Sequence, residues 1–407
     1  MAIKLMHAAD IHIGMENYGK LNPATGLSTR LEDFCATFDE AVNRAIAERV
    51  DLVVLAGDIY KTRDPTPTHQ REFAARVRRL IEAQIPVFIV PGNHDIPMSS
   101  SRATSVDVFR TLELPGVTVA RAIGCWTLQT KSGPIQAIGL PWVTRSQVLA
   151  REDYKNKTIE ELNRLMVELA AEKLRNLAEE LDPAVPAIVV GHAHVFGARV
   201  GAERLLQMGI DPVFDAATFS DLPNVDYVAL GHIHKHQALQ EVSPPIVYAG
   251  SINRVDFSEE QEQKGFVLAE VERGSCRWEF VPVKARPFLT IDARAEGDDP
   301  TARVLQAVFR HGERIRESVV RLRIKGSRAA LGQLDDDQLR GQLKEAFYLL
   351  PFQKESTDED RQRATGRDFQ GKTPLELLQI YLEGKDEPAD RREVLLRYGR
   401  ELMEELA

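Results

Sequence analysis

The chain has 407 residues, 43% hydrophobic and 28% charged, which is enough apolar material for two or three domains with cores of their own. Its formal net charge of −9 excludes a protein that holds nucleic acid by overall positive charge, so such binding would need local basic patches, metals or a partner. No stretch approaches the roughly 18 apolar residues of a membrane span, and the N-terminus lacks the apolar run of a signal peptide. We therefore expect a cytoplasmic protein.

Three apolar runs in the first hundred residues each end abruptly in polar side chains. The runs and the side chains that follow them are 3–8 with Asp10 and His12, 51–56 with Asp58, and 85–90 with Asn93 and His94. Apolar residues at helical spacing between the runs predict the order β-α-β-α-β, which forms a parallel or mixed sheet with right-handed crossovers. Ligands of open α/β sheets bind at the carboxyl ends of the strands, so these side chains have the position of a site.

Two later predicted strands end in the same way. Residues 187–190 lead into His192, and residues 227–230 lead into His232 and His234. A strand at 135–140 and a long amphipathic helix at 162–181 precede them. The strands at 246–251 and 265–271 follow on shorter loops, which suggests that the sheet turns antiparallel there.

The five strand ends together carry seven potential metal ligands besides His94. They are Asp10, His12, Asp58, Asn93, His192, His232 and His234. Imidazole, carboxylate and amide groups suit Mn, Fe or Zn. Seven ligands are too many for one ion, whereas two ions about 3.5–4 Å apart that share a carboxylate would use them all, and such a pair clamps a phosphoryl centre and supplies hydroxide at neutral pH.

A plainer interpretation exists for each motif alone. A single histidine is more often a hydrogen-bonded core or capping residue, and Gly92-Asn93-His94-Asp95 alone could be an ordinary turn. Recurrence at five strand ends favours the metal site. The three cysteines, Cys35, Cys125 and Cys276, are odd in number and far apart, so we expect buried apolar groups in place of disulfides or zinc ligands.

The order Asp-Ile-His, Gly-Asp, Gly-Asn-His-Asp, Gly-His and Gly-His-Ile-His resembles that of the calcineurin-like metallophosphoesterases. Within that superfamily, residues 191–209, 219–237 and 248–257 are similar to the SbcD-type nucleases of DNA double-strand-break repair. The resemblance implies an α/β fold: a two-sheet metallophosphoesterase sandwich flanked by helices, followed by a small α+β capping domain and C-terminal helices.

The same resemblance implies roles for individual residues. Asp10, His12 and His234 would hold one manganese ion, Asn93, His192 and His232 the other, and Asp58 would bridge the two. His94 would protonate or stabilise the leaving oxygen. Lys61 stands where the archaeal and eukaryotic members have a second cleft histidine, so the substrate would be positioned differently here.

We expect four parts along the chain: a nuclease domain at 1–284, a capping domain at 285–354, a linker at 355–371 and a helical segment at 372–407. In the capping domain, strands at 288–291 and 319–324 should alternate with helices at 301–309 and 336–347.

The helical segment should begin at Thr373-Pro374-Leu375-Glu376, which combines a capping box with proline at the first helical position. Its two predicted helices carry apolar stripes that comprise Leu375, Leu378, Tyr381 and Leu382, and Val394, Leu395, Tyr398, Leu402 and Leu406. Two short helices cannot bury both stripes, so they dock on the capping domain or bind a partner. The resemblance favours a partner, the SMC-like ATPase SbcC.

The sequence thus predicts a metal-dependent DNA exonuclease and endonuclease subunit that acts on DNA ends, hairpins and single strands. The resemblance further implies a homodimer within a heterotetramer. One alternative is an enzyme of the same fold that acts on nucleotides or other small phosphoesters. A second is a non-catalytic scaffold, which the filled ligand positions disfavour.

Overall fold

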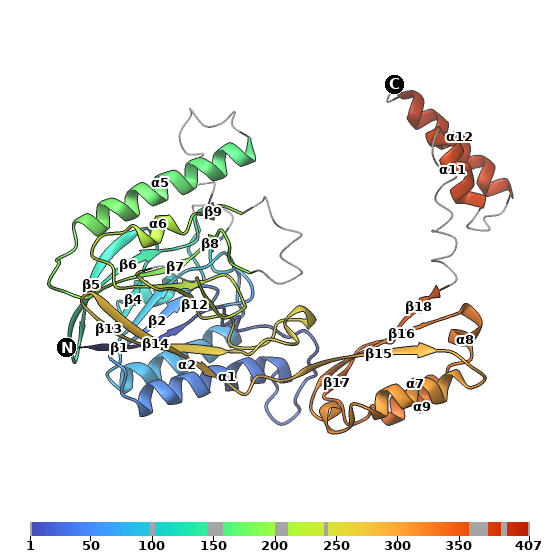
Figure 1. Cartoon of the computed structure of the whole chain (residues 1–407), viewed down its shortest axis with the longest axis horizontal. Coiled ribbons are helices and arrows are strands. Elements are labelled where there is room, and N and C mark those ends of the chain that lie inside the picture. Colours follow the sequence, from blue (N-terminus) through green and yellow to red (C-terminus); the bar gives the residue numbers. More distant parts are fainter. Residues whose placement is uncertain are drawn as a thin grey trace. The chain divides into compact units, whose positions relative to one another are not determined.

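The computed structural model describes residues 2–97, 102–144, 158–199, 211–239, 243–357, 373–383 and 389–405 (Figure 1). The chain divides into two compact units. The first comprises Met1–Thr290, Glu313–Val320 and Glu345–Leu350, and the second comprises Ile291–Gly312, Arg321–Lys344 and Pro351–Ala407. Within the described residues, no helix has both the length and the apolar character needed to cross a membrane.

The first sheet has six strands in the order β14-β13-β1-β2-β3-β4. They are β1 (Ile3–Ala8), β2 (Leu52–Ala56), β3 (Val87–Val90), β4 (Val117–Val119), β13 (Gly265–Glu272) and β14 (Ser275–Pro282). Strands β1, β2 and β3 are parallel, as predicted, β4 continues the sheet in the same direction, and β13 joins β1 in the antiparallel direction. The polar groups that follow β1, β2 and β3 therefore emerge at the same edge.

The second sheet has the order β11-β12-β10-β7-β6-β5. Its strands are β5 (Gly124–Thr130), β6 (Gly133–Leu140), β7 (Ala187–His192), β10 (Tyr227–Gly231), β11 (Gln237–Leu239) and β12 (Ile246–Tyr248). The prediction of antiparallel strands at 246–251 and 265–271 is confirmed for β13, which is antiparallel to β1, and is wrong for β12, which is parallel to β10. The short strand β11, which the sequence analysis missed, pairs antiparallel with β12, so the chain reverses twice between β10 and β12.

The two sheets pack face to face, with helices on both outer faces (Figure 1). The remaining elements of this part are α1 (Thr29–Ala47), α2 (Pro67–Glu82), α3 (Asp107–Thr111), α5 (Ile159–Glu179), β8 (His194–Val195), β9 (Val213–Phe214), α6 (Ala217–Ser220) and η3 (Phe257–Glu259). Helices α1 and α2 cover the first sheet, and α5 and α6 cover the second. The predicted two-sheet sandwich is confirmed, and β2 is buried throughout because both of its faces are covered.

The prediction for the cysteines is wrong in part. Cys35 in α1 is buried, but Cys125 is exposed and Cys276 is partly exposed. Cys125 lies in β5, at the edge of the second sheet, where alternate residues face the solvent.

A further sheet follows the sandwich, with the order β15-β16-β17 and with β18 also paired to β16. The elements are β15 (Phe288–Ala295), α7 (Pro300–Phe309), η4 (Gly312–Ile315), β16 (Val319–Gly326), α8 (Arg328–Gly332), α9 (Asp336–Gln342), β17 (Tyr348–Leu349) and β18 (Gln353–Ser356). Helix α9 ends before the predicted Phe347, whose backbone N–H donates to Ser318 O at 3.0 Å and so joins the sheet region instead.

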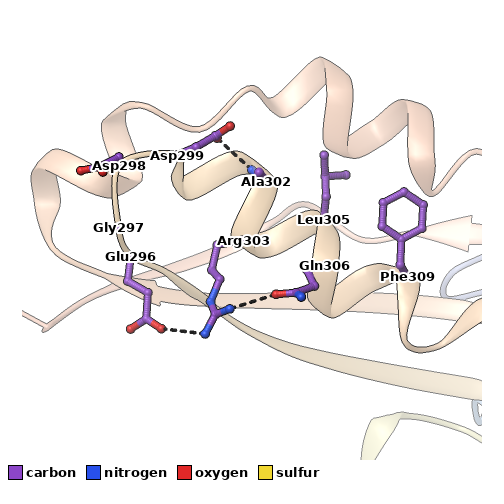
Figure 2. A pocket seen from close by; sticks show the side chains of 9 residues that line it. All are labelled: Glu296, Gly297, Asp298, Asp299, Ala302, Arg303, Leu305, Gln306 and Phe309. Atoms are coloured by element: carbon purple, nitrogen blue, oxygen red, sulfur yellow. Dashed lines mark hydrogen bonds and ion pairs between the residues drawn. The ribbon is translucent and has the colours of Figure 1, made fainter.

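Helix α7 borders an open hollow of about 970 Å³ (Figure 2). Arg303 in this hollow lies 3.6 Å from a Glu296 carboxylate oxygen and donates to Gln306 Oε1 at 2.9 Å. Asp299 caps the helix by accepting from Ala302 N at 2.9 Å. These polar groups bind one another, and the candidate metal clusters among the described residues lie elsewhere.

The C-terminal helices are α11 (Pro374–Glu383) and α12 (Ala389–Glu405). The predicted capping box is present, since Thr373 N donates to Glu376 Oε2 and Glu376 N donates to Thr373 Oγ1. The residues of the two apolar stripes differ in exposure. Leu382 is buried, whereas Tyr381, Leu395 and Tyr398 are 59%, 37% and 55% exposed. Leu406 and the side chain of Leu402 lie outside the described part of the chain.

We predict that the contact between the two sheets contributes strongly to stability. Phe88 in β3 is fully buried, and its ring lies 5.5 Å from that of Trp126 in the other sheet. Phe88→Ala should lower the free energy of unfolding by about 3–5 kcal/mol, measured by chemical denaturation. Phe196→Ala, at a ring that is 74% exposed, is the control and should change stability by less than about 0.5 kcal/mol. Equal effects of the two substitutions would contradict the prediction.

Candidate metal centre

The structure brings all eight predicted site residues together at the meeting edge of the two sheets. Those from the first sheet are Asp10 and His12 after β1, Asp58 after β2, and Asn93 and His94 after β3. Those from the second sheet are His192, the last residue of β7, and His232 and His234 after β10. Each position follows from a buried apolar strand that delivers a polar group at its carboxyl end.

Three of these side chains form a first cluster of donor atoms. Asp10, His12 and His234 each offer an atom within 4.8 Å of the others. The Nε2 atoms of His12 and His234 are 3.0 Å apart, and His234 Nε2 lies 3.8 Å from Asp10 Oδ1. Asp10 and His12 are buried, and His234 is 15% exposed.

A second cluster surrounds the amide of Asn93. Its Oδ1 atom lies 3.1 Å from His192 Nε2 and 3.2 Å from His232 Nδ1. An amide oxygen and two imidazole nitrogens that converge in this way could hold one divalent cation.

Asp58 lies between the two clusters. Its Oδ1 atom is 3.5 Å from His192 Nε2, and its Oδ2 atom is 3.8 Å from His12 Nε2. The fully buried carboxylate thus directs one oxygen toward each cluster.

One buried oxygen without a partner supports the fit of these residues to metal ions. Asp58 Oδ2 is buried and has no hydrogen-bond partner among the described residues. A buried carboxylate oxygen without a partner is costly unless a cation compensates it. The mixed nitrogen and oxygen donor set is one that divalent transition metals accept.

The backbone at the site is held in unusual conformations. Asp10, His12, Asp58 and His232 have positive φ values of 49°, 48°, 52° and 95°. Non-glycine residues rarely adopt such values, which cost about 1–3 kcal/mol each and concentrate at functional sites. Two hydrogen bonds between the loops hold this geometry, from Asp10 N to Gly57 O and from His12 N to Asp58 O, both of 3.0 Å.

The glycines of the motifs allow the loops to approach closely. A Cβ atom at Gly92 would lie 2.2 Å from Asp58 Oδ1, and one at Gly57 would lie 2.2 Å from His192 Nδ1. Only glycine therefore fits at these positions without displacing a donor.

The ionisation of the clusters follows from burial and from Asp58. Burial lowers the pKa of His12, which therefore keeps a neutral ring with a free lone pair. Burial also acts to lower the pKa of His192, but the Asp58 carboxylate outweighs it and raises that pKa to about 9. Conversely, burial acts to raise the pKa of Asp58, but His192 and the other histidines hold it well below its usual value. Asp58 is thus a carboxylate.

His94 differs from the seven potential ligands in its exposure and contacts. Its side chain is 32% exposed, and its Nε2 atom lies 4.0 Å from Asp58 Oδ2. Its Nδ1 atom donates to Lys61 O at 2.8 Å, and its backbone N–H donates to Asp58 Oδ1 at 2.8 Å. Burial lowers its pKa. His94 can therefore reach a substrate while remaining fixed against the central carboxylate.

Three residues that support the site were not predicted from the sequence. Asp95 accepts from the backbone N–H groups of Ile59, Tyr60 and Gly92 at 2.9–3.1 Å and so ties together the loops after β2 and β3. The Trp142 ring lies 4.7 Å from the His232 ring, and Glu259 accepts from His234 Nδ1 at 2.6 Å. Asp95 could have been identified from its place in the Gly-Asn-His-Asp motif. Trp142 and Glu259 follow loops that carry no motif.

A cleft of about 510 Å³ opens on the clusters. Its lining includes the cations Lys61, Arg63 and Lys235 and the acids Asp211, Asp256 and Glu262. The cations could bind phosphate oxygens, and the side chain of His94 also lines this cleft.

Comparison with known proteins gives the chain's relatives. It is 23% identical to the DNA double-strand break repair protein Mre11 of Archaeoglobus fulgidus over 80% of this chain and 69% of that protein. It is 26% identical to the protein of the same name from Methanosarcina mazei over 81% of this chain, and the match spans 46% of that longer relative. It is 28% identical to the SbcD subunit of the nuclease SbcCD from Staphylococcus epidermidis over 73% of each chain.

The sequence profile of the calcineurin-like phosphoesterases matches residues 3–236. This range is more than half of the chain and contains all seven potential ligands and His94. Enzymes of that family use two divalent metal ions. The cluster of Asp10, His12 and His234, the group of Asp10, Asp58 and His192, and the Asn93 amide beside His192 and His232 are candidate sites for such a pair. The chain is therefore a member of the calcineurin-like phosphoesterase family.

Proposed function

We propose that this protein is the nuclease subunit of an SbcCD-like complex, which hydrolyses phosphodiester bonds at DNA double-strand ends and hairpins in repair and recombination. The observation that carries the proposal is Asp58, a buried carboxylate with one oxygen toward each of two donor clusters. The names of the three relatives, which cover 73–81% of this chain, supply the substrate class.

We assign the ligands as the sequence analysis predicts. Asp10, His12 and His234 would hold one ion, Asn93, His192 and His232 the other, and Asp58 would contact both. Mn²⁺ suits these nitrogen and oxygen donors. When bound, the ions would supply Lewis-acid stabilisation of the phosphoryl oxygens and lower the pKa of a water molecule.

The chain's own residues complete the proposed mechanism. Lys61, Arg63 and Lys235 line the cleft and would bind the phosphates that flank the scissile bond. His94 would contact the leaving oxygen through Nε2, because its Nδ1–H is committed to Lys61 O. It could donate a proton only in its doubly protonated form, which gives up that proton more readily than an ordinary imidazolium because burial lowers the pKa of His94.

The division of the chain remains part of the proposal. Residues 1–284 would form the nuclease domain, 285–354 the capping domain, 355–371 a linker and 372–407 a partner-binding segment. Tyr381, Leu395 and Tyr398 on α11 and α12 expose apolar area that the rest of the described chain does not cover. Such anchors commonly seat an amphipathic helix in a partner's groove, here that of the ATPase SbcC. The subunit itself would be a homodimer within a heterotetramer.

The central prediction concerns Asp58. With Mn²⁺, the protein should cleave duplex DNA ends and single strands faster than it hydrolyses nucleotides. Asp58→Asn should reduce DNA cleavage by about a thousandfold or more and lower the metal content below two ions per chain, because it removes the charge shared by both clusters. Turnover can be measured on labelled DNA and metal content by elemental analysis.

Asp51→Asn is the matched control for this substitution. Asp51 lies just before β2, at the end opposite to Asp58, and accepts from Lys4 N at 2.8 Å and Ser132 Oγ at 2.7 Å. Its substitution should leave metal content unchanged. Wild-type turnover in Asp58→Asn would exclude the two-ion site, and a preference for nucleotides would identify an enzyme for small phosphoesters.

A second prediction separates His94 from the ligands. His94→Ala should retain both metal ions but cleave DNA about 10²–10⁴-fold more slowly, the usual loss for a general acid. His69→Ala is the control, since that residue lies in the first turn of α2 and its ring pairs with Glu16 at 3.1 Å. Loss of metal together with activity in His94→Ala would mean that His94 is a ligand.

A third prediction concerns the C-terminal helices. Leu395→Glu with Tyr398→Glu should release the ATPase subunit in a pull-down, because it places charge on the exposed apolar surface. Metal-dependent cleavage of short single strands should persist. Arg400→Glu makes the same change of two charge units at an exposed position on the opposite face of α12 and should retain the partner. If the variant at Leu395 and Tyr398 still captures the ATPase subunit at full strength, the two helices pack against their own chain and do not bind the partner.

A further inference from the structure

A buried carboxylate stands behind His234, on the side away from the donor clusters. Glu259, the last residue of η3, is 4% exposed. Its Oε1 atom accepts from His234 Nδ1 at 2.6 Å, and its Oε2 atom accepts from Val255 N at 3.0 Å. Because a carboxylate only accepts, the proton of the neutral His234 ring resides on Nδ1 and the lone pair on Nε2 faces Asp10 and His12.

Lys264 holds both the side chain of Glu259 and the backbone of His234. Its side chain is fully buried, and its Nζ atom lies 2.8 Å from Glu259 Oε2 and 2.7 Å from Glu262 Oε2. The third donor of the ammonium reaches the backbone carbonyl of His234 at 3.1 Å. One cation therefore holds the carboxylate that orients the His234 ring and also the main chain that carries it.

His234 differs in this respect from His192 of the second cluster. His192 Nδ1 donates to a neutral carbonyl, Ala56 O, at 2.8 Å. A hydrogen bond to a carboxylate is roughly twice as strong as one to a neutral group, and it makes the opposite ring nitrogen more electron-rich. The first cluster thus has a histidine that is both oriented and made a better donor.

The cost of burying these charges argues that the pair does more than stabilise the fold. A buried ion pair gains little net stability over apolar residues of the same size, because desolvation offsets the attraction. Glu259 and Lys264 nevertheless occupy the interior directly behind a candidate ligand. A purely structural role for the turn would be served without a carboxylate aimed at an imidazole.

We propose that Glu259, held by Lys264, is a positioning residue that fixes His234 as the Nδ1–H tautomer and thereby sets the affinity of Asp10, His12 and His234 for a divalent metal ion. This inference rests on the proposed function, in which those three residues hold one ion. It concerns the geometry and donor strength of His234, since the Glu259 oxygens are bound by His234 Nδ1, Val255 N and Lys264 Nζ.

The tautomer can be observed directly in the wild-type protein without metal. Long-range ¹⁵N–¹H NMR on histidine-labelled protein at mildly alkaline pH, with His234→Gln for assignment, should show His234 protonated at Nδ1 and unprotonated at Nε2. In Glu259→Gln the same ring should lose this single tautomer and show a mixture. A wild-type His234 protonated at Nε2 would overturn the proposal, whatever the stability of the variants.

Metal affinity gives the second measurement. In calorimetric titration with Mn²⁺, Glu259→Gln should weaken one of two sites about 10–100-fold, the loss typical of a group that supports a metal ligand. The double variant Glu259→Gln with Lys264→Met removes both charges, so no buried lysine loses a carboxylate partner. Its affinity for Mn²⁺ at the same site should be weakened equally. Equal affinity in wild type and double variant would overturn the proposal.

Glu260→Gln is the matched control, since it removes the same charge from the next residue. Its carboxylate accepts from Thr290 N at 3.0 Å and Thr290 Oγ1 at 2.6 Å and does not contact His234. Glu260→Gln should bind Mn²⁺ as the wild type does. If it loses as much Mn²⁺ affinity as Glu259→Gln, the negative charge of the turn matters and the orientation of the His234 ring does not. Failure of the wild type itself to bind Mn²⁺ would contradict the proposed function, whereas two intact sites in Glu259→Gln would contradict this inference alone.

Discussion

The structure depends on the placement of one buried carboxylate, Asp58, where the strand ends of two sheets meet. A carboxylate loses much of its hydration in such a place, and the fold compensates it with the neighbouring His192 ring and with backbone N–H groups such as that of His94. The loops can approach closely only because Gly57 and Gly92 lack side chains. The glycines that precede the polar residues in the motifs are therefore part of the same constraint.

The rigid sandwich allows the site to hold strained backbone. Positive φ angles at Asp10, His12, Asp58 and His232 together cost several kcal/mol, at about 1–3 kcal/mol each. The surrounding strands are buried on both faces and fix the ends of each loop. Asp95 adds a further restraint, since it accepts hydrogen bonds from three backbone N–H groups of two loops and so holds these loops together. Donor positions are thus set before any ion binds.

The sequence alone was sufficient for β1, β2, β3, β7 and β10 and for the polar groups at their ends, because an apolar run followed by Gly-Asp or Gly-His is a local signal. It failed where geometry depends on contacts distant in sequence. The short strand β11 reversed the direction expected of β12, and the edge position of β5 exposed Cys125. Glu259 and Lys264 lie beyond the last motif and reach His234 only through the fold, so no spacing rule could identify them.

The distribution of donors between the sheets links metal binding to folding. The first sheet supplies the carboxylates Asp10 and Asp58 together with His12 and Asn93, whereas the second supplies three imidazoles. Neither sheet alone offers a complete set for two ions, and an unfolded chain offers none. Ions that bind only when the sheets are docked must stabilise the docked state by the free energy of binding. The same contacts that prepare the site for phosphodiester chemistry would therefore also join the two halves of the sandwich.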